Sequence, residues 1–87
     1  MNFLHYEFNL QAGDHVIVTL DKQANVQLMD TTNFSSYQSG RRYTYYGGLA
    51  TVSPFSIQAP SSGNWHVAID TGGYPGTVRA SVSVSRR

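Results

Sequence analysis

Apolar residues alternate with polar residues along most of this 87-residue chain, and no long segment shows the three-to-four-residue spacing of a helix. Strand-like runs cover residues 4–10, 16–20, 24–28, 43–46, 52–59, 65–69 and 78–84, separated by short polar or glycine-rich segments. A parallel sheet needs crossover connections, usually helical, and no segment here is suited to form one. The pattern therefore predicts an all-β fold: a single antiparallel β-sandwich, jelly-roll-like, with about seven strands.

One interval, between the third and fourth runs, lacks this alternation and predicts a single short helical turn near residues 33–37. Asp30 and the two threonines that follow it can cap the start of such a turn, and Gly40 can end it. Phe34 and Tyr37 are three residues apart, so one turn would direct both side chains toward the core.

The chain length fits one domain over residues 1–87 with a modest core, because a chain of this size buries only about 60–65% of its unfolded surface. Pro54 near the start of its run indicates an edge strand or a bulge. If Trp65 is buried, its indole N–H needs a hydrogen-bond partner. The expected core residues are the apolar members of the runs: Leu4, Tyr6, Phe8, Val16, Val18, Val26, Leu28, Phe55, Ile57, Trp65, Val67, Ile69, Val78, Val82 and Val84.

Charge gives little indication of a partner. Six Lys and Arg residues against five Asp and Glu residues leave a net charge of +1, too small for a strong field toward nucleic acid or membrane. The first residues show neither a basic start nor a long apolar run, and no segment approaches the roughly 20 apolar residues that cross a bilayer. We therefore expect a cytoplasmic protein with no membrane partner.

One acidic motif deserves comparison with an enzyme class. Asp70-Thr71-Gly72 follows the apolar run 65–69 and looks like the active-site triplet of aspartic proteases. Only fifteen residues follow Gly72, too few for the flap and second apolar half of a retroviral-type protease. We therefore expect no enzyme and no catalytic residue, with a small hydrolase centred on Asp70 as a remote alternative.

The three histidines, His5, His15 and His66, show no spacing that would hold a metal on one strand or helix. His5 and His66 each lie opposite an expected core face, so we expect both to reach solvent or a neighbouring strand. A site assembled across strands with Asp14 or Asp70 stays open as an alternative. The expectation from spacing is no metal ligand and no cofactor.

The strongest candidate for recognition is the segment 40–48, in which two arginines and three tyrosines lie between glycines. Arginine and tyrosine are residue types that dominate recognition surfaces. A second exposed aromatic side chain is expected at the tip of the loop at residues 74–77. The predicted binding residues are Arg41, Arg42, Tyr43, Tyr45, Tyr46 and Tyr74.

These residues predict a non-catalytic binding or protein-interaction module, whose arginines would pair with carboxylate or phosphate groups. The partner is expected to be a protein, and self-association through an edge strand is possible. A weak single-stranded nucleic-acid-binding domain is the alternative, with phosphates on arginine and bases on tyrosine. Binding dominated by phosphate contacts would fall steeply as salt rises, which separates the two hypotheses.

Five motifs together resemble a small bacterial family catalogued as domain of unknown function 1883: Phe3–Tyr6, Ala24–Asp30, Asn33–Tyr37, Gly40–Tyr43 with Tyr45–Gly48, and Gly63–Val67. The resemblance spans nearly the whole chain and implies an all-β fold. Some relatives carry the domain beside signalling modules of the TIR type, which implies a recognition role. It brings no catalytic residues to this sequence.

Overall fold

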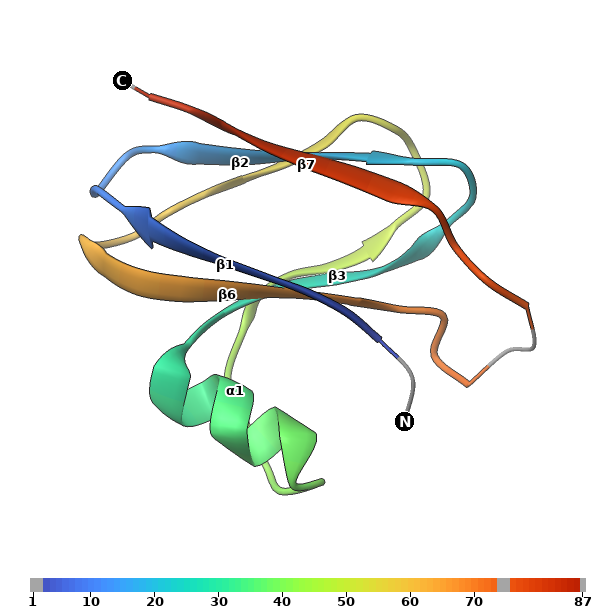
Figure 1. Cartoon of the computed structure of the whole chain (residues 1–87), viewed down its shortest axis with the longest axis horizontal. Coiled ribbons are helices and arrows are strands. Elements are labelled where there is room, and N and C mark those ends of the chain that lie inside the picture. The colour runs from blue at the N-terminus through green and yellow to red at the C-terminus, as the bar shows by residue number, and fades with distance from the viewer. Residues whose placement is uncertain (1–2, 74–75, 87) are drawn as a thin grey trace.

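The computed structural model describes residues 3–73 and 76–86, which form two antiparallel sheets and one helix (Figure 1). One sheet has the strand order β1-β6-β3-β4 and the other has the order β5-β2-β7. The elements are β1 (Leu4–Leu10), β2 (His15–Leu20), β3 (Ala24–Asp30), α1 (Thr31–Gln38), β4 (Tyr46–Ala50), β5 (Phe55–Gln58), β6 (Gly63–Asp70) and β7 (Ala80–Ser85). The predicted antiparallel sandwich of seven strands is confirmed.

The main core lies between the two sheets and is built from the alternating positions that the sequence indicates. Trp65 is buried, and its indole N–H donates to the carbonyl oxygen of Ser61 at 3.0 Å, as a buried indole requires. Of the predicted core residues, Leu4, Tyr6, Phe8, Phe55, Val78, Val82 and Val84 are only partly buried and pack against the rim of this core.

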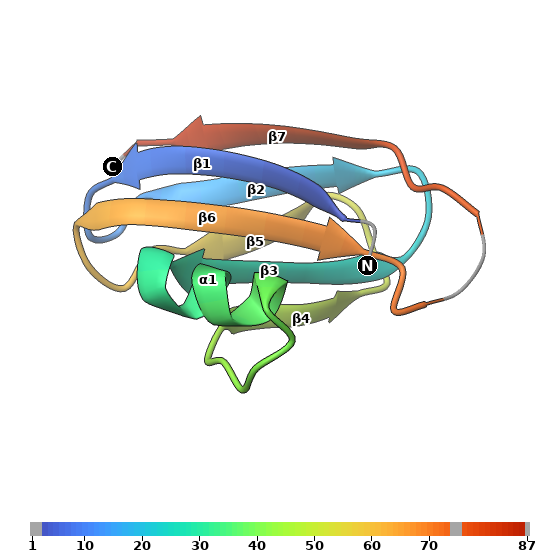
Figure 2. The same cartoon turned by 60° about the horizontal axis from the view of Figure 1, so that its bottom comes forward.

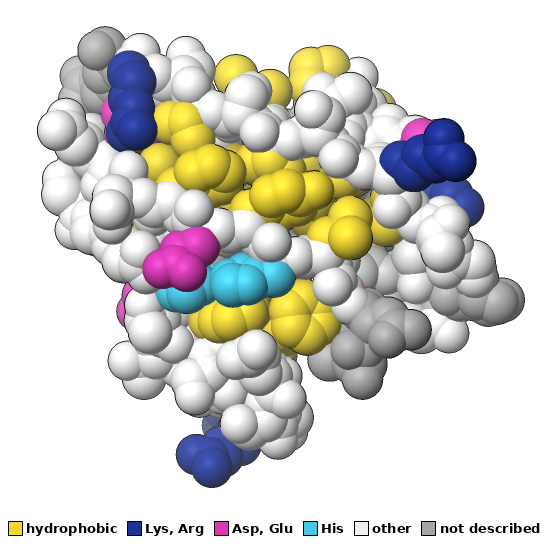
Figure 3. Space-filling model, in the orientation of Figure 1, with side chains coloured by type: hydrophobic (Ala, Val, Ile, Leu, Met, Phe, Trp, Pro, Cys, Tyr) yellow, Lys and Arg dark blue, Asp and Glu magenta, His cyan; other side chains and the backbone are white. Residues whose placement is uncertain are grey.

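Apart from Phe55, which lies on β5 at the opposite edge of its sheet, these partly buried residues mark a seam where the sandwich is open. β1 and β7 are the edge strands of their sheets and lie on the same side of the molecule. Figure 3 shows a band of hydrophobic side chains across this side, between the positions of the two strands. The Tyr6 hydroxyl donates to the carbonyl oxygen of Ala80 at 3.5 Å and so links the two edges.

α1 covers the outer face of the four-stranded sheet, against β3 and β6 (Figure 2). Asp30 caps the helix: its side chain accepts a hydrogen bond from the Asn33 backbone N–H at 2.8 Å. Phe34 and Tyr37 are buried from the helix side in a second cluster, together with Met29 and Ala68. The predicted helical turn is confirmed, and it extends to eight residues.

The predicted strand at Tyr43–Tyr46 is wrong, because β4 begins only at Tyr46. In the register that pairs Leu28 with Tyr46, residues 43–45 would face the end of β3 and the start of α1. At that point the chain turns into the helix, and the Thr44 N–H donates instead to the Asn33 side chain at 2.8 Å. No partner strand is left for residues 43–45.

The predicted strand 52–59 is shorter than expected, since β5 starts after Pro54 and forms the edge of its sheet. The expected edge position is therefore confirmed. In β4, the strand that precedes β5, Gly47 has a φ of +109°, and a Cβ there would lie 2.3 Å from the Val26 carbonyl oxygen. β4 can approach β3 this closely only because residue 47 is glycine.

No helix among the described residues is long and apolar enough to cross a membrane.

Candidate functional site

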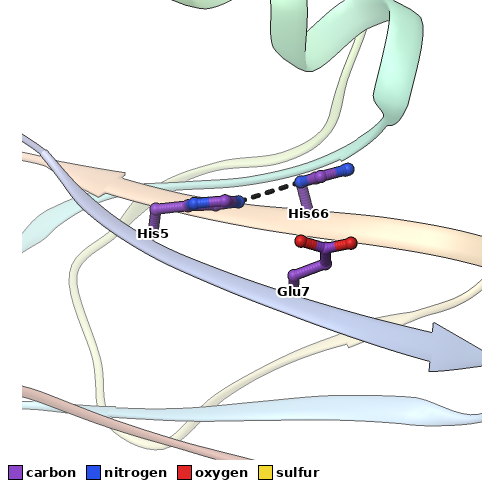
Figure 4. Close-up of side chains that lie close together, drawn as sticks. All are labelled: His5, Glu7 and His66. Atoms are coloured by element: carbon purple, nitrogen blue, oxygen red, sulfur yellow. Dashed lines mark hydrogen bonds between the residues drawn. The ribbon is translucent and has the colours of Figure 1, made fainter.

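Two histidines and one glutamate meet on the outer face of the four-stranded sheet, beside α1. Figure 4 shows His5 and Glu7 on β1 and His66 on the adjacent β6, with their side chains converging. One potential ligand atom from each residue lies within 4.8 Å of the others. His5 Nε2 and His66 Nδ1 are 2.9 Å apart. We call these three residues the His–Glu cluster.

The strand register explains why these residues meet. β1 and β6 are antiparallel, with Glu7 opposite His66 and His5 opposite Ala68. Since side chains two apart on a strand share one face, His5 and Glu7 both point to the outer face while Tyr6 points to the core. His66 therefore has Glu7 directly across from it and His5 on the diagonal, within reach for long side chains.

A chain of hydrogen bonds fixes how His66 presents its nitrogens. The Thr31 hydroxyl donates to Asn64 Oδ1 at 3.1 Å and lies 3.0 Å from His66 Nε2. Because the single hydroxyl proton goes to Asn64, the contact is satisfied when His66 Nε2–H donates to the Thr31 oxygen. The Nδ1 lone pair of His66 then faces His5, whose Nε2–H supplies the proton of the 2.9 Å contact.

Phe34 from α1 lies against both imidazoles and restricts their orientation. Its ring stacks on His5 at a centroid distance of 4.1 Å and on His66 at 4.6 Å. His66 is buried, whereas His5 and Glu7 are exposed. Burial lowers the pKa of the His66 imidazole below its ordinary value; proximity to His5 adds to this, and Glu7 and Asp30 act in the opposite direction.

Asp70, the candidate of the remote hydrolase hypothesis, is the last residue of β6, lies on the same face as His66 and is buried. Its carboxylate accepts hydrogen bonds from the Tyr37 hydroxyl at 2.6 Å, from the Asn25 amide at 2.9 Å and from the Gly72 N–H at 2.8 Å. Burial, reinforced by this hydrogen bond, raises the pKa of Tyr37 well above its ordinary range. These contacts support a structural role for Asp70 in holding α1 to the sheet.

The predicted Arg/Tyr binding residues do not form one continuous face. Tyr43 is half-buried, packs edge-on against Tyr37 at a centroid distance of 5.1 Å, and has its hydroxyl 3.2 Å from the Gln27 amide nitrogen. Tyr46 lies on β4 with its ring against Trp65, at the edge of the main core. Tyr43 therefore helps to hold α1 against the sheet, while Tyr46 packs at the rim of the main core.

Only part of the predicted binding segment, residues 40–48, is exposed. Arg41, Arg42 and Tyr45 are exposed in the connection between α1 and β4, and Tyr46 and Leu49 are exposed on β4 itself. Within the described part of the chain, neither arginine makes a side-chain hydrogen bond or ion pair. Tyr74, the remaining predicted binding residue, lies outside the described residues.

Spacing along the sequence did not predict the His–Glu cluster, although one signal was present. His5-x-Glu7 places two potential ligands on one face of a strand. The third, His66, is 61 positions away from His5 and reaches them only through the β1–β6 register. Both histidines lie on the face opposite the main core, as expected. This face is not fully exposed, however, because α1 covers it and buries His66.

The chain matches, over residues 1–87, the family described as Domain of unknown function (DUF1883). The chain belongs to this family. Comparisons with curated proteins and with solved structures give no match. Membership of DUF1883 confirms the resemblance carried by the sequence motifs.

Proposed function

We propose that this domain is a non-catalytic binding module that recognises a partner protein through an exposed β4 surface formed by Arg41, Arg42, Tyr45, Tyr46 and Leu49. The observation that carries the proposal is exposed apolar area at an edge strand, beside Arg41 and Arg42, which make no ion pair with the described residues. Tyr45, Tyr46 and Leu49 have 42%, 47% and 57% of their surface exposed. Large side chains of this kind supply contact area in protein interfaces.

The edge position supports an extended partner segment. β4 is the last strand of its sheet, so one side of its backbone has no neighbouring strand in the same sheet. Such an edge can accept a further strand through main-chain hydrogen bonds, while flanking side chains give specificity. Because both arginines lack acidic partners within the described residues, the segment that fits is an extended one carrying acidic residues.

Site-specific photo-crosslinking tests this proposal in the cytoplasm, the compartment in which the partner is sought. A photoreactive residue at position 45 should give a defined protein adduct, and one at Ser83, exposed on β7, should not. The purified partner should then bind Tyr45→Ala more weakly by about 1–2 kcal/mol. Equal adducts from both positions, or unchanged affinity for Tyr45→Ala, would contradict the proposal.

Single-stranded nucleic acid is the alternative ligand, because an exposed tyrosine beside two arginines can stack a base and pair phosphates. Titration with a mixed single-stranded oligonucleotide at two salt concentrations separates the two ligands. Binding that falls steeply with salt and is lost in Tyr45→Ala would favour nucleic acid. A second copy of this chain captured at position 45 would instead indicate self-association through β4.

A further inference from the structure

We propose that the His–Glu cluster binds a divalent transition-metal ion, with zinc as the ion that its ligands fit best. His5 Nε2, His66 Nδ1 and one carboxylate oxygen of Glu7 would be the protein ligands. The proposal concerns the outer face at β1 and β6 and is independent of the exposed β4 surface. A metal site is compatible with a binding module, and neither proposal needs the other.

The donor set selects the class of ion. Two imidazole nitrogens and one carboxylate oxygen suit zinc and the neighbouring transition metals, whereas calcium and magnesium prefer oxygen ligands alone. Zinc is bound by three protein ligands of this kind in sites that keep a fourth position open. Zinc is therefore the first ion to test, and magnesium is the matched negative control.

The distances need only small adjustments. Nitrogen ligands about 2.05 Å from a tetrahedral zinc ion lie about 3.3 Å from each other. His5 Nε2 and His66 Nδ1 are already 2.9 Å apart, so the two rings must separate by only a few tenths of an ångström. The carboxylate of Glu7, within 4.8 Å of both, is the farthest group, and it belongs to an exposed side chain that can change rotamer.

The hydrogen bonds prepare the correct nitrogens. Thr31 accepts the Nε2–H of His66 at 3.0 Å, which leaves the Nδ1 lone pair directed at the cluster. His5 must free its Nε2, which a neutral imidazole does by carrying its proton on Nδ1 instead. The metal then replaces the proton that joins the two rings, and it lies to one side of the line between the two nitrogens, so both rings must also rotate to direct their lone pairs at it. Thr31 acts as the outer partner that metal-binding histidines commonly have.

Packing on one side and openness on the other complete the site. Phe34 stacks on both imidazoles from α1, and the β1–β6 pairing fixes the strands that carry the ligands. In Figure 3 the histidine side chains are visible at the surface next to an acidic side chain, so an ion can enter from solvent. The fourth coordination position would face solvent and take water or a ligand atom from another molecule.

Calorimetric titration with zinc chloride tests the proposal on the untagged full chain after treatment with a chelator. We expect one equivalent of zinc to bind and magnesium chloride to give no heat of binding. His5→Gln and Glu7→Gln change exposed side chains, so they should remain folded and should weaken zinc binding about tenfold or more. His15→Gln, which changes the histidine on β2, is the matched control and should bind like the parent.

Nitrogen chemical shifts of the imidazoles give a readout that altered packing would not mimic. Zinc should shift His5 Nε2 and His66 Nδ1, while His66 Nε2 stays protonated and His15 is unaffected. Thr31→Val should weaken binding about 10–100-fold and Thr31→Ser should preserve it, since serine keeps the hydroxyl. Zinc that shifts His15, unaltered binding in Glu7→Gln, or no stoichiometric binding by the folded parent would each overturn the proposal.

Discussion

β6 carries two polar clusters on its outer face, one around Asp70 at its C-terminal end and one around His66 near its middle. The clusters differ in how completely their hydrogen-bonding groups are satisfied. At the C-terminal end the buried Asp70 carboxylate accepts three hydrogen bonds from Tyr37, Asn25 and Gly72. In the His–Glu cluster, His5 and Glu7 are exposed, and a single proton joins the two imidazoles. Buried and saturated groups anchor the helix, while exposed and partly satisfied groups remain available for a ligand.

The largest expected effect is that of Asp70→Ala. Removing the carboxylate leaves the buried Tyr37 hydroxyl and the half-buried Asn25 amide without their acceptor, which should lower the free energy of unfolding by about 3–5 kcal/mol. Glu7→Ala, in the exposed part of the His–Glu cluster, should lower the free energy of unfolding by less than about 0.5 kcal/mol. Urea unfolding followed by the fluorescence of Trp65, the sole tryptophan, measures both. Similar costs for the two variants would abolish the distinction between the clusters.

Tyr37→Phe isolates one hydrogen bond of the saturated cluster. It should cost about 2 kcal/mol, because Asp70 loses its shortest hydrogen bond and keeps the other two. The pKa of Tyr37 is raised in the folded state, so the unfolded chain loses this proton first, near pH 10. Stability of the parent should therefore fall as pH rises above about 10.

Tyr37→Phe also serves as the control for this pH effect. Tyr37→Phe should lose stability less steeply than the parent above about pH 10, because it no longer carries the tyrosine whose proton is retained on folding. Unfolding by urea at several alkaline pH values gives the two slopes. Parallel pH profiles for parent and variant would mean that Tyr37 ionises alike in the folded and unfolded states.

Acid should lower the stability of the fold through His66 in the His–Glu cluster. The pKa of His66 is lowered in the folded state, so the unfolded chain binds a proton first as pH falls below about 6.5. Stability should therefore decrease with falling pH in this window, and His66→Gln should flatten the dependence. His5, Glu7 and Asp30 are the titratable groups that face His66, and His15→Gln is the control. A profile that flattens equally in the control would assign the effect elsewhere.

Much of the sandwich could be predicted because the period-2 alternation of residues such as Val16, Val18 and Val67 depends only on the local sequence. The failure at Tyr43–Tyr46 has a nonlocal cause: strand propensity favoured pairing, but α1 removes the partner that residues 43–45 would need. Propensity describes the strand alone, whereas pairing also requires a neighbour.

The candidate sites show the same limit more strongly. The position of α1 determines that Tyr43 is half-buried and that Tyr45 is exposed. Two neighbouring tyrosines of one segment therefore differ in role: Tyr43 anchors the helix, and Tyr45 faces solvent. The His–Glu cluster depends on the register of β1 against β6, which joins residues 61 positions apart. Spacing along the chain contains no information about that register, so local motifs could suggest His5 and Glu7 but not His66.

The smallest expected effect on stability is that of Glu7→Gln in the presence of a chelator, and it gives the sharpest test of the difference between the Asp70 cluster and the His–Glu cluster. The exposed carboxylate should contribute within about 0.5 kcal/mol, so the variant and the parent should unfold alike without metal. Zinc should raise the thermal midpoint of the parent, since an ion that binds only the folded state stabilises it by mass action. In Glu7→Gln this zinc-dependent rise should largely disappear, whereas Tyr37→Phe, although less stable, should keep it. Loss of the rise in Tyr37→Phe but not in Glu7→Gln would place the ion at Asp70 and reverse the roles assigned to the two clusters.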